Sequence, residues 1–512
     1  MYRLSCELHI SKKQGYNDTS HTSSGIAKRS FPHRSINSNT RFFQFAFFLG
    51  LILCFFSSEA LAQTPASRPA AKKPAAKTKK TAKAAVKKVP AKKIGTTTKK
   101  AVSAKKAAPA KRATKPAKRA TKPVKKPAKR IPFKKALTSP KKKKSKNFSK
   151  NMDKLDKALK QITNILAAVI YRFGRDDKNP WLLSHSLLAI GKGLRMYDGS
   201  YAVDKLVSGF LKFKKVGKTV IPYFPQGDAK NRIEPHPYMH LKTLLELGVP
   251  LSYKFKAGKK TVTLKQLFKS NLDSFPDSPK KERLGVLAWR IFALYGQLPN
   301  NKWGWVNAKG KYVNLFKIIY QLFYFLDRQT TFLRTLKTRG VKTIQKRRQF
   351  IYKEPCGGFH LIQAALRWTG HPLFRNRKRL IALRKAQIEL LFYRLDGEMR
   401  LYSQMFKMYS KKPGHRFLIL LQQLKFIGHF LETMVNLHKW KLFSPTKAQR
   451  LKIRYATKVL YVTVVLIYKL GYYHKLPQLK KASYQYYLDL LGDSAHALHA
   501  IRELQETKIY KK

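Results

Sequence analysis

The feature that most constrains the fold is a helical spacing of apolar residues, which begins near Asn151 and continues to the end of the chain. Between Met152 and Phe173 this spacing covers Leu155, Leu159, Ile162, Ile165, Leu166, Val169 and Ile170. A recurrence every three or four residues places such side chains on one face of an α-helix. Similar stretches follow, separated by short breaks rich in Pro, Gly and Asn, and only Lys254 to Leu264 favours a β-hairpin. The spacing therefore predicts an all-α domain over residues 151–512.

Six of the apolar helical segments carry a histidine or a tryptophan at a comparable point, where we expect the helix to begin. These residues are His185, His240, Trp289, His360, His429 and His496. Each interval between them has room for one or two further helices. Six inner helices, each joined to an outer helix, resemble the (α/α)6 toroid of terpene cyclases, prenyltransferase β-subunits, lanthionine synthetases and many polysaccharide lyases. The resemblance concerns repeat architecture alone, and an α-solenoid of helical hairpins is the alternative.

Two of these segments share a longer motif, Glu-Pro-[His/Cys]-x-x-x-His, which spans residues 234–240 and 354–360. Residues four apart lie on one face of a helix, so each motif can present two metal ligands side by side. His236, His240, Cys356 and His360 form the predicted metal set, which suits zinc or another transition metal. Glu234, Glu354 and His185 are the candidate catalytic residues, with the two glutamates as general bases or as groups that orient a ligand histidine.

Other interpretations of the two motifs stay open at this point. Glu-Pro is also favourable chemistry for a helix start, because proline suits the first turn and an acid complements the helix dipole. The histidines then have structural roles, or they line a site without a metal. Cys356 as a nucleophile with His360 as its base is a further hypothesis, although two residues four apart on one helix seldom have the geometry for attack.

Residues 63–150 form a second region of very different composition. They consist mainly of Lys, Ala, Pro and Thr, contain no acidic residue and repeat AKRATKP twice over 110–123. Such a segment buries too little apolar surface to offset its conformational entropy, so we predict a disordered polycation. It resembles the tails of linker histones, which implies binding to nucleic acid without sequence readout. The whole chain carries a formal charge of +83, so an anionic partner is expected: nucleic acid, polysaccharide, lipopolysaccharide or acidic lipid.

The N-terminal region, residues 1–62, has the pattern of an export signal. Arg41 precedes an apolar run over 42–56, and Ala60-Leu61-Ala62 offers the small residues that a signal peptidase reads. We therefore predict cleavage after Ala62 and a periplasmic or extracellular protein, with a membrane anchor at 42–56 as the alternative. The first 40 residues are long for a signal and favour a later true start. After cleavage Cys356 is the one remaining cysteine, so no intramolecular disulfide is expected.

Three hypotheses of function follow from these patterns. The first is an exported basic protein that binds an anionic polymer through its tail and its helical domain, without turnover. The second is an (α/α)-barrel enzyme, with or without a metal, that acts on an anionic glycan or polymer. The third is a histone-like protein that compacts nucleic acid. The charge alone favours the first, whereas the second requires the histidine-bearing segments to converge on one site.

Overall fold

The computed structural model describes residues 141–511 except 227–235, 237, 279–282 and 347–348. All described residues lie in the compact unit from Ala128 to Lys512. The predicted signal, the anchor alternative and residues 63–140 of the predicted tail lie outside the described part, as does Glu234. None of the helices in the described part combines the length and the apolar character that crossing a bilayer requires.

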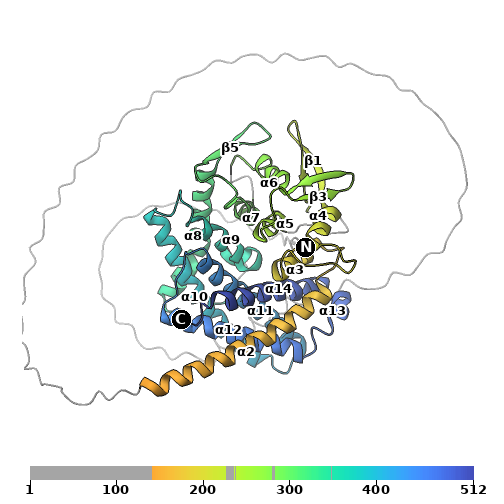
Figure 1. The fold of residues 1–512 in the computed structure, drawn as a ribbon. Helices are drawn as coiled ribbons and strands as arrows, with labels where there is room; N and C mark the ends of the chain where they lie inside the picture. Colours follow the sequence, from red (N-terminus) through yellow and green to blue (C-terminus); the bar gives the residue numbers. More distant parts are fainter. Residues whose placement is uncertain (1–140, 227–235, 237, 279–282, 347–348, 512) are drawn as a thin grey trace, which may run out of the picture. The chain divides into compact units, whose positions relative to one another are not determined.

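The described residues are mostly helical, as predicted, with thirteen α-helices and three short hairpins (Figure 1). In chain order the elements are α2 (Lys141–Phe173), α3 (Pro180–Ile190), α4 (Ala202–Phe210), β1 (Lys212–Val216), β2 (Thr219–Tyr223), α5 (Met239–Glu246), β3 (Lys254–Ala257), β4 (Lys260–Thr263), α6 (Leu264–Asp273), α7 (Leu284–Leu294), β5 (Gly304–Val306), β6 (Tyr312–Asn314), α8 (Leu315–Thr338), η2 (Phe350–Lys353), η3 (Pro355–Gly358), α9 (Phe359–Trp368), α10 (Lys378–Met408), α11 (Pro413–Lys439), α12 (Lys447–Lys469), α13 (Leu476–Ala482) and α14 (Tyr484–Thr507).

Six helices are buried on every side and form the centre of this unit. In α7 the residues from Leu287 to Leu294 are all buried, and in α3 the same holds from Leu182 to Ala189. Eight consecutive helical residues point in all directions, so these helices need protein around their full circumference. The contacts between them follow chain order: α3 with α5, α5 with α7, α7 with α9, α9 with α11, and α14 with both α11 and α3.

The remaining long helices cover these six and are amphipathic. Helix α4 contacts α3, α6 contacts α7, α8 contacts α7 and α9, and α10 and α12 contact α11, while α2 contacts α14 and α12. Helix α2 agrees with the predicted spacing, since it buries Leu155, Leu159, Ile162, Leu166, Val169 and Ile170, while Ile165 is half-buried and the other residues between Leu155 and Ile170 are partly or fully exposed. Burial on one face alone is what a covering helix requires.

Helix α2 begins at Lys141, directly after Pro140, and so extends into the segment that was predicted as tail. The run from Lys141 to Lys150 contains no proline or glycine, so its backbone chemistry is compatible with a helix. The division into tail and helical domain at residue 150 stays a prediction.

Three antiparallel hairpins project from the helices, and one of them is the predicted hairpin at 254–264, seen as β3–β4. The sequence did not reveal β1–β2 and β5–β6. Lysines occupy most of β1, so it has no apolar alternation, and β5 and β6 are three residues each, too short to show a period.

The prediction that each of the six marked residues begins its helix is correct only for His240 and His360. His185 and Trp289 lie in the middle of α3 and α7, and His429 and His496 lie deep inside α11 and α14. The residues upstream of His429 and His496 belong to the same helices, which begin at Pro413 and Tyr484.

Candidate metal centre

Four histidine rings from four central helices meet in the interior of the domain. His185 comes from α3, His360 from α9, His429 from α11 and His496 from α14, and all four side chains are buried. The ring centroid of His496 lies 4.0 Å from that of His429, 5.0 Å from that of His185 and 5.4 Å from that of His360. His360 and His429 are 4.9 Å apart. Helices far apart in the sequence thus bring imidazoles to one place.

Glu432 orients two of these rings from one side. Its carboxylate lies one helical turn after His429 on α11 and is itself buried. Nδ1 of His429 is 3.3 Å from Oε2 of Glu432, and Nδ1 of His496 is 3.1 Å from the same oxygen. Because a carboxylate only accepts, each Nδ1–H donates to it, and Nε2 of each ring is left for another partner.

The two Nε2 atoms are the outstanding feature of the site. In the described part of the chain both are buried and make no hydrogen bond of ordinary geometry, although the Cys356 side chain is close enough to the His429 ring to raise its pKa. A buried polar atom without a partner costs free energy, so such atoms usually mark a ligand, a water or an ion. Imidazoles held by a carboxylate through Nδ1 and open at Nε2 are typical of metal-ligand histidines.

Cys356 and His360 complete a donor set around His429. The ligand atoms of Cys356, His360 and His429 all lie within 4.8 Å of one another, and so do those of His429, Glu432 and His496. His429 belongs to both groups and links them. Cysteine sulfur and imidazole nitrogen in a group of three suit zinc, which commonly keeps a fourth position open for a non-protein ligand.

The turn that carries Cys356 is held in a conformation that most residues avoid. Cys356, Gly357 and Gly358 have φ angles of 55°, 62° and 79°, directly before α9 begins at Phe359. Glycine adopts this left-handed region without strain, whereas cysteine does so at a cost, so the fold must hold the turn in place. The pair Gly357-Gly358 therefore lets the chain turn sharply and point the sulfur toward His429.

A buried ionic network holds the same turn from behind. Arg394 on α10 donates through Nη1 to the carbonyl oxygen of Gly357 at 3.1 Å and through Nε to Glu398 at 2.9 Å. Lys346 and the hydroxyl of Tyr352 also contact the Glu398 carboxylate, at 2.9 Å and 3.0 Å. Burial by itself would raise the pKa of the Glu398 carboxyl. The positive charges of Lys346 and Arg394 have the larger effect and hold this pKa below its usual range.

The charge states of the rings follow from burial and from their neighbours. Burial, with the charges of neighbouring histidines, lowers the pKa values of His185 and His360 well below the ordinary value and that of His496 to about 4. Burial acts in the same sense on His429, but Cys356 and Glu432 outweigh it and raise the pKa of His429 to about 10. Three rings are thus neutral near pH 7, the form that binds metals.

The predicted site residues divide into two sets. Cys356, His360 and His185 lie in or beside the cluster, whereas His236 and His240 belong to neither of the two donor groups found in the described residues. The His236 ring stacks on Trp289 at 5.9 Å, and Trp289 lies 4.4 Å from His360. His240 bonds through Nδ1 with the Ser184 hydroxyl at 2.5 Å.

The two predicted glutamates take no part in the donor groups found among the described residues. Glu354 is half-buried, burial raises its pKa, and the charge of Arg283 opposes that change. Glu234 lies outside the described residues. Their predicted catalytic roles therefore stay predictions.

No motif in the sequence assigns His429, Glu432 and His496 to the site. Both histidines were recognised as marks of central helices, but no motif links them to Cys356. Glu432 stands inside an apolar stretch of α11, Phe430-Leu431-Glu432-Thr433-Met434-Val435, and an acid in such a stretch is a signal of a buried functional group. This pattern alone could have pointed to Glu432.

Asp493, one turn before His496 on α14, leads to a pH-dependent prediction. Burial, partly offset by Lys425, raises the pKa of Asp493 to about 7. The folded chain then holds a proton at pH values where the unfolded chain, with a pKa near 4, has released it. This contribution to the free energy of unfolding therefore falls by roughly 1 kcal/mol per pH unit as pH rises from about 4 to about 7. Chemical denaturation of Asp493→Asn at several pH values should show a smaller fall than the wild type, and parallel curves would contradict the assignment.

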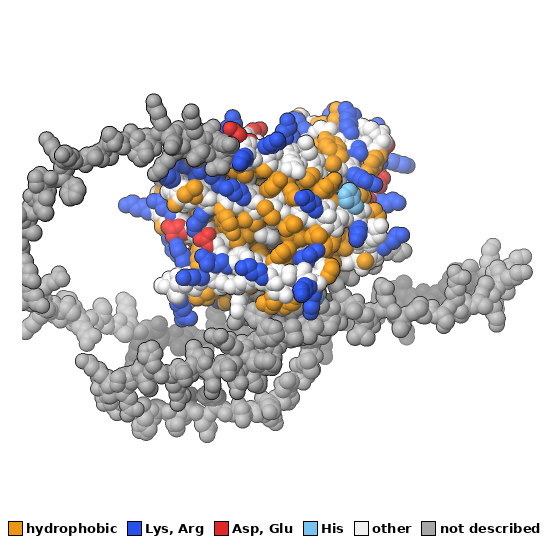
Figure 2. All heavy atoms as spheres, turned by 90° about the horizontal axis from the view of Figure 1, so that it is seen from below, with side chains coloured by type: hydrophobic (Ala, Val, Ile, Leu, Met, Phe, Trp, Pro, Cys, Tyr) orange, Lys and Arg blue, Asp and Glu red, His pale blue; other side chains and the backbone are white. Residues whose placement is uncertain are grey.

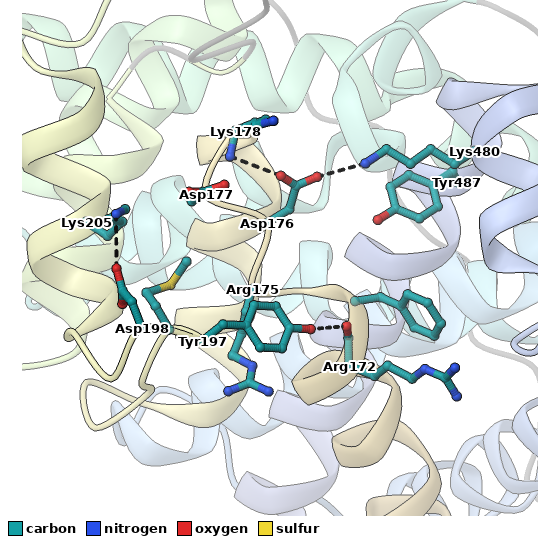
Figure 3. Close-up of a pocket in the computed structure, with 12 residues that line it drawn as sticks. Arg172, Arg175, Asp176, Asp177, Lys178, Tyr197, Asp198, Lys205, Lys480 and Tyr487 are labelled. Atoms are coloured by element: carbon teal, nitrogen blue, oxygen red, sulfur yellow. Dashed lines mark hydrogen bonds and ion pairs between the residues drawn. The ribbon is translucent and has the colours of Figure 1, made fainter.

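A separate surface pocket of about 460 Å³ lies beside the ends of α2 and α14 (Figure 3). Two ion pairs lie within its lining: Asp176 with Lys480 at 3.0 Å, and Asp198 with Lys205 at 3.3 Å. Neither donor group contributes a residue to its lining. This pocket and the two donor groups are therefore separate sites.

The chain matches no protein-family model, no curated protein and no solved structure.

Proposed function

We propose that the chain is a metal-dependent enzyme whose centre is formed by Cys356, His360 and His429, with Glu432 and His496 beside them. One observation carries this proposal: two buried imidazoles share one carboxylate through Nδ1 and make no hydrogen bond of ordinary geometry through Nε2. A purely structural histidine would use both nitrogens, or expose one to water. The convergence of four central helices on these residues favours the enzyme hypothesis over binding without turnover.

We propose the (α/α)6 toroid as the architecture that holds this centre. The support is the order of contacts, in which α3, α5, α7, α9, α11 and α14 each contact the next and α14 returns to α3. A covering helix stands in the chain between each consecutive pair. A closed ring of inner helices directs side chains from all six toward one axis, and an open solenoid would not return to its first helix.

Zinc is the ion that the donor set fits best. One thiolate and two imidazoles are borderline-soft ligands, which zinc prefers over the oxygen ligands that suit magnesium or calcium. His429, whose pKa is about 10, has to release a proton when it binds the ion. Bound by three protein ligands, zinc supplies a Lewis acid at its fourth position. The neutral His496 and His185 stand next to that donor set, where they are able to accept or donate a proton.

The proposed substrate class is an anionic polymer or glycan in the periplasm or outside the cell. The net charge of +83 supports an anionic partner, because a strongly positive chain concentrates polyanions around itself. The location outside the cell or in the periplasm and the anionic substrate are both inferred from the sequence.

Elemental analysis of the purified full chain tests the metal centre. We expect about one zinc ion per chain in the wild type. The double variant Cys356→Ala/His429→Gln should lose that zinc, because it removes two of three ligands. His474→Ala is the matched control, since this exposed histidine lies outside both donor groups. A wild type without a stoichiometric metal, or a double variant that keeps its zinc, would overturn the proposal.

A second candidate function uses the same residues without a metal. The Cys356 sulfur is close enough to His429 to raise the pKa of the imidazole, while Glu432 accepts from the far side of the ring. Catalytic triads place a nucleophile, a base and an orienting carboxylate in the same order. Alkylation by iodoacetamide separates the candidates: a zinc-bound thiolate reacts only after a chelator is added, whereas a free thiolate–imidazolium pair reacts at the same rate with and without it.

A further inference from the structure

Helix α12 is apolar on the side that faces solvent as well as on the side that faces the core. Ile453, Leu460 and Val464 are buried against the domain. On the opposite side Leu451, Tyr455 and Val462 are 54%, 48% and 51% exposed. These three recur at spacings of four and seven residues, which places them on one face of the helix. We call them the outer stripe of α12; Val459, Val465 and Leu466 beside them are half-buried.

The outer stripe is bordered mainly by positive charge; Asp396, which lies near Tyr455, is paired with Lys452. Helix α12 contains no acidic residue, and its basic residues are Lys447, Arg450, Lys452, Arg454, Lys458 and Lys469. The neighbouring helix α2 contacts α12, with the hydroxyl of Tyr461 donating to Gln161 at 3.0 Å, and it exposes Lys154, Lys157 and Lys160. Figure 2 shows the face on which α2 and α12 lie in Figure 1: apolar side chains gather in its middle and Lys and Arg lie around them.

We infer that this face docks on the surface of a bilayer containing anionic phospholipid. An apolar stripe over residues 451–462, with lysines beside it, matches the boundary between acyl chains and negative head groups, where aliphatic chains insert and ammonium groups remain at the phosphates. No helix of the described residues is suited to crossing a bilayer, so α12 would lie on the membrane rather than span it.

Charge and apolar character together favour lipid over other occupants. If a second copy of the chain docked there, the basic residues around the outer stripe of one copy would face those of the other. Like charges at short range disfavour that contact. A polysaccharide or nucleic acid complements the charge but offers no apolar surface to Leu451 and Val462. This inference is independent of the metal centre, since none of the stripe residues belongs to either donor group.

A photocrosslinker placed in the outer stripe identifies the occupant directly. The full chain carries p-benzoylphenylalanine in place of Val462, or, as the matched control, in place of Val306, which is 62% exposed on the β5 strand. Each protein is irradiated with vesicles of phosphatidylglycerol and phosphatidylcholine in equal parts. We expect a phosphatidylglycerol adduct at position 462 and none at position 306. The crosslinker reacts only with molecules next to the labelled residue. Binding of the basic tail to the same vesicles therefore does not by itself produce a lipid adduct at position 462.

Two substitutions test whether the stripe itself drives the contact. Leu451→Gln/Tyr455→Gln, in the chain that carries the crosslinker at 462, should lower the lipid adduct about tenfold, because two partly inserted side chains lose their apolar transfer free energy. Val220→Gln/Val306→Gln changes two exposed valines on hairpins and should leave the adduct unchanged. All four positions are exposed, so folding is preserved, and thermal melts verify this.

Three results would overturn the inference. An adduct between position 462 and a peptide, from a second copy or from another segment of the same chain, would assign the stripe to protein contact. Equal lipid adducts at 462 and 306 would show that the stripe has no special role. Adducts of equal yield with vesicles of phosphatidylcholine alone would remove the requirement for anionic lipid.

Discussion

Glu432→Gln is expected to weaken zinc binding by about 10- to 100-fold, which is the range found when a group that orients a metal ligand is removed. The carboxylate accepts from Nδ1 of both His429 and His496 and so directs both Nε2 atoms toward the donor set. A neutral amide has nearly the same shape but makes these bonds weaker and offers one oxygen instead of two. Titration against a chelator of known zinc affinity measures the change.

A surface variant controls for the loss of one negative charge. Glu389→Gln removes an exposed carboxylate that pairs with Lys337 at 2.6 Å, and it should leave zinc affinity unchanged. Glu432→Asp is informative as well, since it keeps the charge and shortens the reach, and an intermediate affinity is expected. Wild-type affinity in Glu432→Gln would show that the carboxylate does not orient the ligands.

Glu398→Ala is expected to lower the free energy of unfolding by about 3–5 kcal/mol, the cost of leaving a buried charge without its partner. The side chains of Glu398 and Arg394 are 0% and 1% exposed, so water does not replace the missing carboxylate at the guanidinium. Lys346 and Tyr352 also lose their contact with it. Urea denaturation measures the change.

The same substitution should weaken zinc binding, which links this network to the site. Arg394 holds the carbonyl of Gly357 and thereby the turn of Cys356, and without Glu398 its guanidinium is free to rotate away. Glu389→Ala, which breaks a surface pair, should cost less than about 1 kcal/mol and leave zinc bound. A Glu398→Ala chain that is destabilised but keeps wild-type zinc affinity would show that the network is structural only.

Helix content was predictable because it depends on local spacing. The apolar period of α2 identified its buried face residue by residue, and the hairpin β3–β4 was visible in an alternating stretch of the sequence. The hairpins β1–β2 and β5–β6 were not predictable in the same way, because lysine-rich or three-residue strands have no apolar period. The ends of α11 and α14 were misplaced for a related reason, since their polar first turns do not stand out from a loop.

For the site, the sequence by itself determined which residue types were available, and it marked Cys356 and His360 as one motif with ligand chemistry on a helix start. Their partners were decided by tertiary structure: His429, Glu432 and His496 join them, rather than His236 and His240. The physical reason is that residues four apart share a helix face by local geometry alone, whereas residues on α9, α11 and α14 meet only when those helices pack. How the helices pack depends on the burial of side chains over the whole domain. A short motif contains no information about that.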